Sequence, residues 1–292
     1  MKKVLFITNP VAGRLGSRAA LFDVLNEFNK KDYDVTAKIT QYRGHAEDLA
    51  AGAQAAGYEA VVCAGGDGTA CECVGGILKS NSSIPLGYIP CGSTNDFGTA
   101  LGLSMIPEQA ARAITKEKPV PVDIGKFNDR YFNYVASFGA FTAVSYSVDQ
   151  NLKNTYGYLA YLVEGLKDLG SIQPHAMTVI ADGREFEGRY VFGAVSNSTR
   201  VAGILHYNMV DLDDGLFELL LVKEIKSALD VNKIIAGAAN SDFTSDAFEY
   251  VKCKEAKFIM DDPIPWSLDG EKAEGRNIVN ITNLHSAVRI FK

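Results

Sequence analysis

The sequence lacks a long apolar run: across its 292 residues no stretch reaches the ~18 apolar residues that a membrane-spanning helix needs. The apolar run after Lys2 and Lys3 ends at Asn9-Pro10, too early for a secretory signal peptide. A block of basic residues is also missing and the formal net charge is −6, so nucleic acid is not expected as the main partner. We therefore expect a cytoplasmic protein, in which any contact with anionic lipid comes from a local patch.

The five cysteines provide neither a disulfide framework nor a zinc site. Their number is odd, and Cys71 and Cys73 are separated by a single residue, closer than is usual for zinc ligands. Hydrophobic residues make up 47% of the chain and charged residues 22%, the balance of an ordinary globular protein. We expect reduced thiols in a folded cytosolic chain.

A glycine-rich stretch at residues 63–69 reads C-A-G-G-D-G-T, between a buried-strand run at residues 60–62 and a helix-like run at residues 71–79. A strand, a glycine turn and a helix in this order bind phosphate in α/β proteins, because glycine lets backbone N–H groups approach the anion. Asp67 would repel phosphate unless a cation lay between them, so it indicates Mg²⁺. The alternative is a tight glycine turn with a solvated Asp67.

Two more turns of this kind follow predicted strands in the first half. Asn9, Pro10 and Gly13 follow a strand at residues 4–8, and G-S-T-N-D-F-G at residues 92–98 follows a strand at residues 84–89. With further strands at residues 33–40 and 60–64 and helices between them, the pattern predicts a parallel sheet covered on both faces. Ligands bind beyond the carboxyl ends of such strands, so the three turns should converge on one edge.

The pattern changes after Gly125 to strands separated by short turns, including the hairpin signal Asp182-Gly183. The fold class predicted is α/β, with an N-terminal Rossmann-like doubly wound sheet domain and, from the many strands with short turns, a C-terminal antiparallel β-sandwich domain or barrel. In the second half, strands are predicted at residues 131–137, 175–180, 185–186, 187–195, 216–222, 249–260 and 277–282, and helices at residues 156–169 and 227–239.

The G-G-D-G-T run at residues 65–69 resembles the nucleotide motif shared by diacylglycerol kinases, NAD kinases and phosphofructokinases. Asn9-Pro10 with Gly13, and the run at residues 92–97, narrow the resemblance to bacterial diacylglycerol kinases and related lipid kinases. The ordered motifs extend over nearly all of the chain, and Gly98, where the family has alanine, is a mild departure.

The resemblance implies a nucleotide-binding domain at residues 1–124 and a lipid-substrate β-sandwich at residues 125–284, with a final strand around residues 288–291, in the segment 285–292, returning to the first domain. Glu72 has a second interpretation, in which its charge suits the start of a helix. The residues that the resemblance assigns to the nucleotide are Asn9, Pro10, Val11, Ala12, Gly13, Thr40, Gly65, Gly66, Asp67, Gly68, Thr69, Glu72, Ser93, Thr94, Asn95 and Asp96.

The resemblance also implies metal ligands. Asp67, Asp96 and Asp123 match acidic positions that would hold Mg²⁺ and its waters against the ATP phosphates. In some members of the family, the loop that matches residues 211–216 holds a structural Mg²⁺, and the ligands by position are Asp211, Asp214 and Leu216. The alternative is a turn in which Asp and Gly serve the backbone.

Residues 266–271, W-S-L-D-G-E, resemble the second catalytic signature of these kinases. Asp269 matches the catalytic base and Glu271 the neighbouring carboxylate that supports the Mg²⁺ network. A lipid hydroxyl has a high pKa, so a carboxylate within hydrogen-bond reach must take its proton as it attacks phosphorus. The alternative is another Asp-Gly turn in a β-domain.

The predicted enzyme is an ATP- and Mg²⁺-dependent lipid kinase with diacylglycerol as the default acceptor, giving phosphatidic acid. Phosphatidylglycerol, a sphingoid base or another lipid alcohol would need the same residues. The rivals are an NAD kinase, disfavoured by the motif at residues 92–97 and by Asp269, and a non-catalytic nucleotide- or lipid-binding regulator, disfavoured by the intact carboxylates. A lipid alcohol substrate implies transient, peripheral contact with the inner face of the membrane, and strand edges of the sandwich would allow a homodimer.

Overall fold

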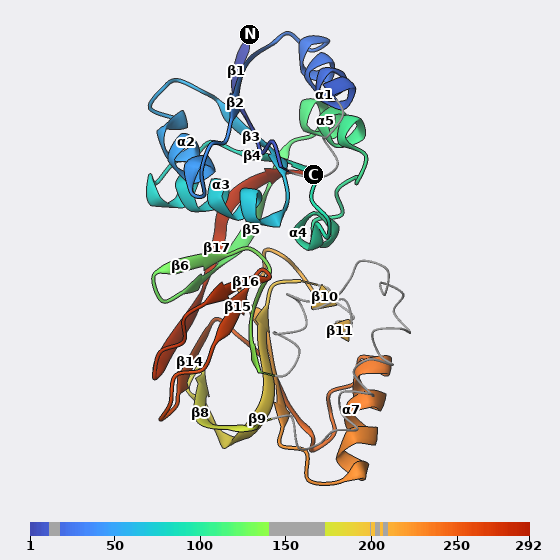
Figure 1. Cartoon of the computed structure of the whole chain (residues 1–292), viewed down its shortest axis with the longest axis vertical. Helices are drawn as coiled ribbons and strands as arrows, with labels where there is room; N and C mark the ends of the chain where they lie inside the picture. Colours follow the sequence, from blue (N-terminus) through green and yellow to red (C-terminus); the bar gives the residue numbers. More distant parts are fainter. Residues whose placement is uncertain (12–17, 140–172, 199, 202–204, 207–209) are drawn as a thin grey trace. The chain divides into compact units, whose positions relative to one another are not determined.

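The computed structural model describes residues 1–11, 18–139, 173–198, 200–201, 205–206 and 210–292 (Figure 1). These residues form two compact units: unit 1 is Met1–Ile124 with His285–Lys292, and unit 2 is Gly125–Leu284. The chain leaves unit 1 within strand β5 (Pro119–Phe127) and returns to it within strand β17 (Ile278–Phe291). The predicted helix at residues 156–169 lies outside the described residues.

Unit 1 is built on a parallel sheet in the order β2–β1–β3–β4–β17. All six residues of β3 are buried, as expected for a strand covered on both faces. Besides parts of β5 and β17, the elements of unit 1 are β1 (Lys2–Thr8), β2 (Tyr33–Ile39), β3 (Ala60–Gly65), β4 (Leu86–Pro90), α1 (Arg18–Asn29), α2 (His45–Ala53), α3 (Asp67–Lys79), α4 (Asp96–Ala100) and α5 (Pro107–Lys116).

Helices cover the unit 1 sheet on both sides. Figure 1 shows α1 and α5 together on one side and α2 and α3 on the other. Val4 and Phe6 of β1 pack in one buried cluster with Phe28 of α1 and Ile114 of α5. Alternate residues of each strand therefore face different helix layers, and the predicted Rossmann-like arrangement is confirmed.

Unit 2 is an antiparallel β-sandwich, also as predicted. Strand β9 pairs with β8 along its first half and with both β7 and β12 along its second half, so it connects the sheets. The elements of unit 2 are β6 (Arg130–Phe132), β7 (Val135–Gly139), β8 (His175–Ala181), β9 (Arg184–Ser196), β10 (Arg200–Val201), β11 (Leu205–His206), β12 (Phe217–Lys223), β13 (Phe248–Cys253), β14 (Glu255–Ile259), β15 (Trp266–Leu268), β16 (Glu271–Ala273) and helix α7 (Ala228–Asn240).

An aromatic cluster fills the core of unit 2. The only tryptophan, Trp266, is buried, and its ring lies 4.9 Å from Phe138, 5.0 Å from Phe258 and 5.1 Å from Phe127, measured between centroids. The tilted and edge-on geometries are those that aromatic pairs prefer. Strand β15, which begins the predicted second signature at residues 266–271, is therefore anchored in the core at Trp266.

Six strand predictions after Gly125 were wrong in their boundaries. The run at residues 131–137 is two strands, β6 and β7, and the run at residues 249–260 is also two, β13 and β14. Conversely, the strands predicted at residues 185–186 and 187–195 are one strand, β9, and those predicted at residues 277–282 and 288–291 are one strand, β17.

Aspartate side chains explain both breaks. Asp269 accepts the backbone N–H groups of Asn133, Tyr134 and Val135, where β6 gives way to β7. Asp182 accepts those of Lys254 and Glu255 in the same way, where β13 gives way to β14. Backbone N–H groups that bond to a side chain are taken out of the strand ladder.

Candidate active site

The glycine motif is the end of a strand and the start of a helix. Gly65 ends β3, Gly66 is the N-cap of α3, and the helix begins at Asp67, four residues before the predicted start. An acidic residue at this position suits the positive end of the helix dipole. A Cβ on Gly65 would lie 2.6 Å from the Thr69 hydroxyl oxygen, so glycine lets the first helical turn fold back against the strand.

The glycine motifs at residues 65–69 and 92–97 touch through their backbones. The N–H of Cys91 donates to the carbonyl oxygen of Gly65 at 2.7 Å, immediately beyond the pairing of β3 with β4. A Cβ on Gly92 would lie 2.6 Å from the Cα of Gly66 and 2.9 Å from Asn95 Oδ1. Glycine at position 92 therefore lets the two loops meet at the carboxyl edge of the sheet.

The Asp67 carboxylate joins the two motifs. One oxygen accepts the backbone N–H of Phe97 at 3.2 Å and the Tyr88 hydroxyl at 3.3 Å. The other accepts the backbone N–H of Asp96 at 3.0 Å and the Thr94 hydroxyl at 3.4 Å. Burial, and secondly the negative charge of Asp96, raises the pKa of Asp67. A buried carboxylate next to a second one is stabilised by a cation, and this donor chemistry fits Mg²⁺.

The other polar residues of the second motif differ in what they face. Asn95 is buried, has a positive φ of 55°, and bonds back to the N–H and the carbonyl oxygen of Gly92 at 2.8 and 2.9 Å. Ser93 and Thr94 are exposed at the turn. The Asn95 side chain therefore shapes the loop, and the Thr94 hydroxyl joins it to Asp67, while Ser93 is exposed at the edge.

The loop after β1 is tied to α3. Asn9 Nδ2 donates to the Thr69 hydroxyl oxygen at 3.2 Å, and Asn9 Oδ1 accepts the backbone N–H of Val11 at 3.1 Å. Pro10 and Val11 are exposed. The last two residues predicted in this loop, Ala12 and Gly13, lie outside the described residues.

Glu72 makes a contact that neither interpretation of the sequence included. Its two carboxylate oxygens accept the backbone N–H groups of Gly44 at 2.8 Å and Ala46 at 3.2 Å, at the start of α2. Thr40, just before this loop, donates its backbone N–H to the carbonyl oxygen of Thr8 at 2.9 Å. Glu72 therefore holds the loop after β2, which lies beside the loop after β1.

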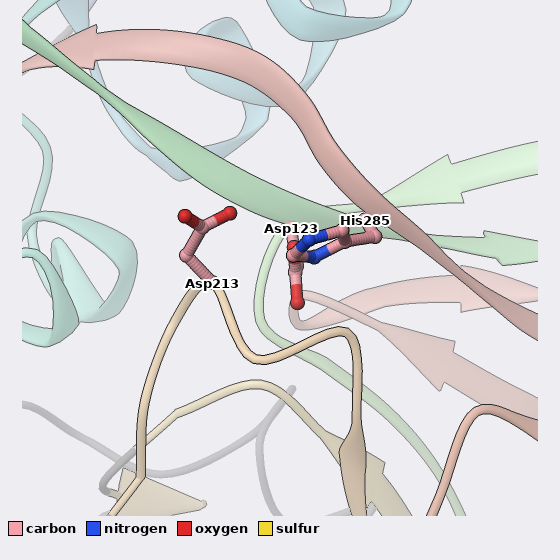
Figure 2. A group of neighbouring side chains, drawn as sticks. All are labelled: Asp123, Asp213 and His285. Atoms are coloured by element: carbon pink, nitrogen blue, oxygen red, sulfur yellow. The ribbon is translucent and has the colours of Figure 1, made fainter.

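Asp123 is fully buried on β5 and bonds to the returning strand β17. Its Oδ1 accepts the backbone N–H of Ser286 at 2.7 Å and lies 3.0 Å from His285 Nδ1. Figure 2 shows the Asp123 and His285 side chains together; Asp213, also drawn there, comes from unit 2. A cation at Asp123 would have to share this oxygen with β17.

The loop at residues 211–216 already has a positive charge beside it. Asp211 and Asp214 accept the backbone N–H groups of Asp213 and Leu216, as in the predicted turn. Lys252 Nζ lies 3.3 Å from the second Asp214 oxygen and 3.2 Å from Glu218 Oε1. A metal ion at Asp214 would therefore have to displace or share the Lys252 ammonium. Sequence reasoning missed Lys252, since it comes from the separate strand β13.

In unit 2, Asp269 and Gly270 form the turn between β15 and β16, with φ of 50° and 84°. Asp269 is buried, and its three backbone donors hold the carboxylate in one orientation. The side chain of Glu271 is 44% exposed and lies 4.0 Å from Arg130. The interpretation as a turn is correct, and it is compatible with a catalytic role.

Residues 3–127 match the family model described as the diacylglycerol kinase catalytic domain. A diacylglycerol kinase from Bacillus subtilis (strain 168) is 31% identical over 276 residues, which are 93% of this chain and 90% of the relative. The chain belongs to the diacylglycerol kinase family. A diacylglycerol kinase from Staphylococcus carnosus (strain TM300) is 31% identical over 294 residues, covering 99% of this chain and 95% of that one.

A solved structure supports the fold of this family member. The crystal structure of a diacylglycerol kinase from Bacillus anthracis str. Sterne aligns with a TM-score of 0.76 at 23% identity, over 99% of this chain and 96% of that chain. Membership of the family makes the chain an enzyme of the lipid kinase class, as predicted. Among the described residues, no helix combines the length and apolarity needed to cross a membrane.

Substituting Gly92 tests the contact between the two motifs. Gly92→Ala should lower the free energy of unfolding by about 1–3 kcal/mol, because the added methyl group meets the backbone of Gly66. The midpoint of thermal unfolding, followed by far-ultraviolet circular dichroism, measures this change. Gly52→Ala in α2 is the matched control: its Cβ meets nothing within 4 Å, so stability should stay equal or rise. Equal midpoints for the two variants would contradict the contact.

Glu218 should make the stability of unit 2 depend on pH. Glu218 is buried and forms an ion pair with Lys252. Burial raises its pKa by more than the ion pair lowers it, so the pKa rises from an ordinary value of 4.5 to about 7. Since the folded state holds the proton more tightly, this contribution is complete below about 4.5 and is lost as pH rises through about 7. At pH 8 the loss is at most about 3 kcal/mol.

The Glu218→Gln variant should therefore show a flatter decline in unfolding free energy between about pH 5 and about pH 8, a range that includes the raised pKa of about 7. Fluorescence of Trp266, which lies in the core of unit 2, reports the unfolding. Glu185→Gln, at an exposed position in β9, should keep the wild-type slope. A Glu218→Gln slope that also equals the wild-type slope would contradict the raised pKa.

Proposed function

We propose that this family member transfers the γ-phosphoryl group of ATP to the free hydroxyl of diacylglycerol in a Mg²⁺-dependent reaction, giving phosphatidic acid. The observation that carries the proposal is the pair of joined motifs at residues 65–69 and 92–97, in a chain that is 31% identical to proteins named diacylglycerol kinase. The acceptor is taken from the names of these relatives.

In this proposal, unit 1 binds the nucleotide. The backbone N–H groups at the start of α3 and the exposed Ser93 hydroxyl supply donors for phosphate oxygens at the carboxyl edge of the sheet, and the Thr94 hydroxyl, which donates to Asp67, would have to turn to join them. Asp67 and Asp96 would hold Mg²⁺, directly or through water, with Asp123 as a third carboxylate on β5. When bound, Mg²⁺ offsets the negative charge of the phosphate chain.

Unit 2 supplies the base. Asp269 takes the proton of the acceptor hydroxyl as its oxygen attacks phosphorus, and Glu271 supports the charge network. The fixed orientation of the Asp269 carboxylate supports this assignment, because a preorganised base loses little entropy on reaction. Asp211, Asp214 and Leu216 form a further proposed cation site, in which Mg²⁺ would have to compete with Lys252.

The substrate implies where the enzyme works. A lipid alcohol is embedded in a bilayer, so we infer transient, peripheral contact with the inner face of the membrane from the cytoplasm. Pairing of sandwich edge strands between copies would give a homodimer.

A transfer assay with radiolabelled ATP, Mg²⁺ and detergent-dispersed diacylglycerol tests the proposed function. We expect labelled phosphatidic acid, and no product when Mg²⁺ is chelated. Label in another phospholipid, when a total lipid extract replaces diacylglycerol, would keep the kinase and change its acceptor. Label only in NADP, when NAD is supplied, would overturn the proposal in favour of an NAD kinase.

Asp269→Asn tests the proposed base. The variant should lose about 100- to 10,000-fold in turnover, because an amide cannot take the proton. Binding of MgADP, measured by calorimetry, should be retained, since the proposed nucleotide residues lie in unit 1.

The control must separate catalysis from the structural role of this side chain. Asp182→Asn is matched, because Asp182 also lies in an Asp-Gly turn and accepts two backbone N–H groups of a neighbouring segment, where Asp269 accepts three. It should lose a similar amount of thermal stability and keep its turnover. If the two variants lose stability and turnover in parallel, Asp269 is not the base.

A further inference from the structure

The loops at the carboxyl edge of the unit 1 sheet are joined in the order of the strands. Backbone hydrogen bonds run from Thr40 to Thr8, from Asn9 to Ala64 and from Cys91 to Gly65, so the loops after β2, β1, β3 and β4 lie side by side. Adjacent strands are about 4.8 Å apart, so this edge extends roughly 14 Å from β4 to β2. An extended nucleoside triphosphate has a comparable length.

The two ends of this edge differ in chemistry. Asp67 and Asp96 lie at the β3–β4 end, which is where Mg²⁺ and the terminal phosphates belong in the proposed function. The β2 end carries aromatic rings instead, in the loop between Thr40 and the start of α2 at His45. A nucleotide with its phosphates at the first end would bring its base to the second.

Tyr42 is held as a fixed and accessible ring at the β2 end. Its ring stacks on His45 with centroids 4.5 Å apart and an interplanar angle of 15°. The Tyr42 hydroxyl donates to Asp48 at 2.9 Å, and His45 Nδ1 accepts the backbone N–H of Gln41 at 3.0 Å. Tyr42 is nevertheless 57% exposed, so its ring offers surface to solvent although it packs against His45.

Glu72 connects this ring to the phosphate motif. It lies on α3, whose first turn contains Asp67 and Thr69, and its carboxylate holds the backbone of Gly44 and Ala46. Gly44 has a positive φ of 89° and no side chain to cap α2, so Glu72 provides the acceptors that the start of α2 needs. The position of the Tyr42 loop is therefore set by the helix that carries the phosphate motif.

From these contacts we propose that the exposed ring of Tyr42 is the stacking platform for the nucleotide base, with Glu72 as the positioning residue that holds the platform. The inference rests on the proposed function and adds a base subsite to it. A base stacks on tyrosine through the contact area of the two rings and needs no hydrogen-bond partner. The subsite therefore binds a purine ring without hydrogen bonds to the polar groups on its edge. Glu72 then acts on the base through the loop, without touching the nucleotide.

Calorimetry on the full chain with two ligands tests the platform: MgADP, which has a base, and magnesium pyrophosphate, which does not. Tyr42→Ala should weaken MgADP binding about tenfold and leave pyrophosphate binding unchanged. Tyr42→Phe keeps the ring and should stay within about threefold of wild type. Phe22→Ala, at an exposed aromatic position on α1, is the matched control and should bind both ligands as wild type does.

Glu72→Gln tests the positioning role, because an amide can accept only one of the two backbone N–H groups. It should raise the KM for ATP with kcat unchanged, and leave pyrophosphate binding unchanged. Equal loss of MgADP and pyrophosphate binding would overturn the assignment in favour of general damage to the edge.

The outcomes separate this inference from the function on which it rests. Wild-type transfer to lipid, together with MgADP binding that Tyr42→Ala leaves unchanged, would overturn the platform alone. A wild-type protein that binds neither MgADP nor ATP would overturn the proposed function and the platform with it.

Discussion

The Asp67 carboxylate connects the two loops on which the candidate nucleotide edge depends. It is the first residue of α3, and it accepts the backbone N–H groups of Asp96 and Phe97, the first two residues of α4. One buried carboxylate at the start of α3 therefore pairs two backbone donors at the start of α4, which would otherwise be left unpaired. Its burial is tolerated because four donors surround it, and the same burial, next to Asp96, makes a cation favourable. The group proposed to act on Mg²⁺ is thus also the group that assembles the site.

In unit 2, two aspartates bond to the backbone of a neighbouring segment in the same way. Asp182 and Asp269 both occupy the first position of an Asp-Gly turn, and both accept backbone N–H groups where a neighbouring strand breaks. An aspartate in the left-handed region leaves its short carboxylate close to the adjacent backbone, which is why this pair of residues suits the task. The device at Asp269 gives a carboxylate a fixed orientation, and this is a requirement for a catalytic base. The structural role of Asp269 is therefore compatible with the proposed role of its carboxylate as a catalytic base.

Helix α3 organises both ends of the proposed nucleotide path. Its first turn carries Asp67 and Thr69, the latter bonded to the loop after β1, and its second turn carries Glu72, bonded to the loop after β2. A displacement of this helix would move the phosphate end and the proposed base end together. Lys252 has a comparable role in unit 2, where its ammonium links Asp214 to the buried Glu218. In both cases the loop that sequence motifs assign to a ligand is held by a side chain from another element.

The sequence by itself determined the fold class, the family and the order of most elements. Continuous apolar runs, glycine turns and the change of pattern at Gly125 are local signals, and local signals specify strands, turns and helices. Only the tertiary structure decided the partners of Glu72 and Lys252, the start of α3 at Asp67, and the breaks that divide β6 from β7 and β13 from β14. The contacts of Glu72, Lys252, Asp182 and Asp269 join residues 26 to 136 positions apart, as Glu72 does with Ala46 and Asp269 with Asn133. No periodicity within a segment encodes such contacts, because they exist only once the sheets have brought the segments together.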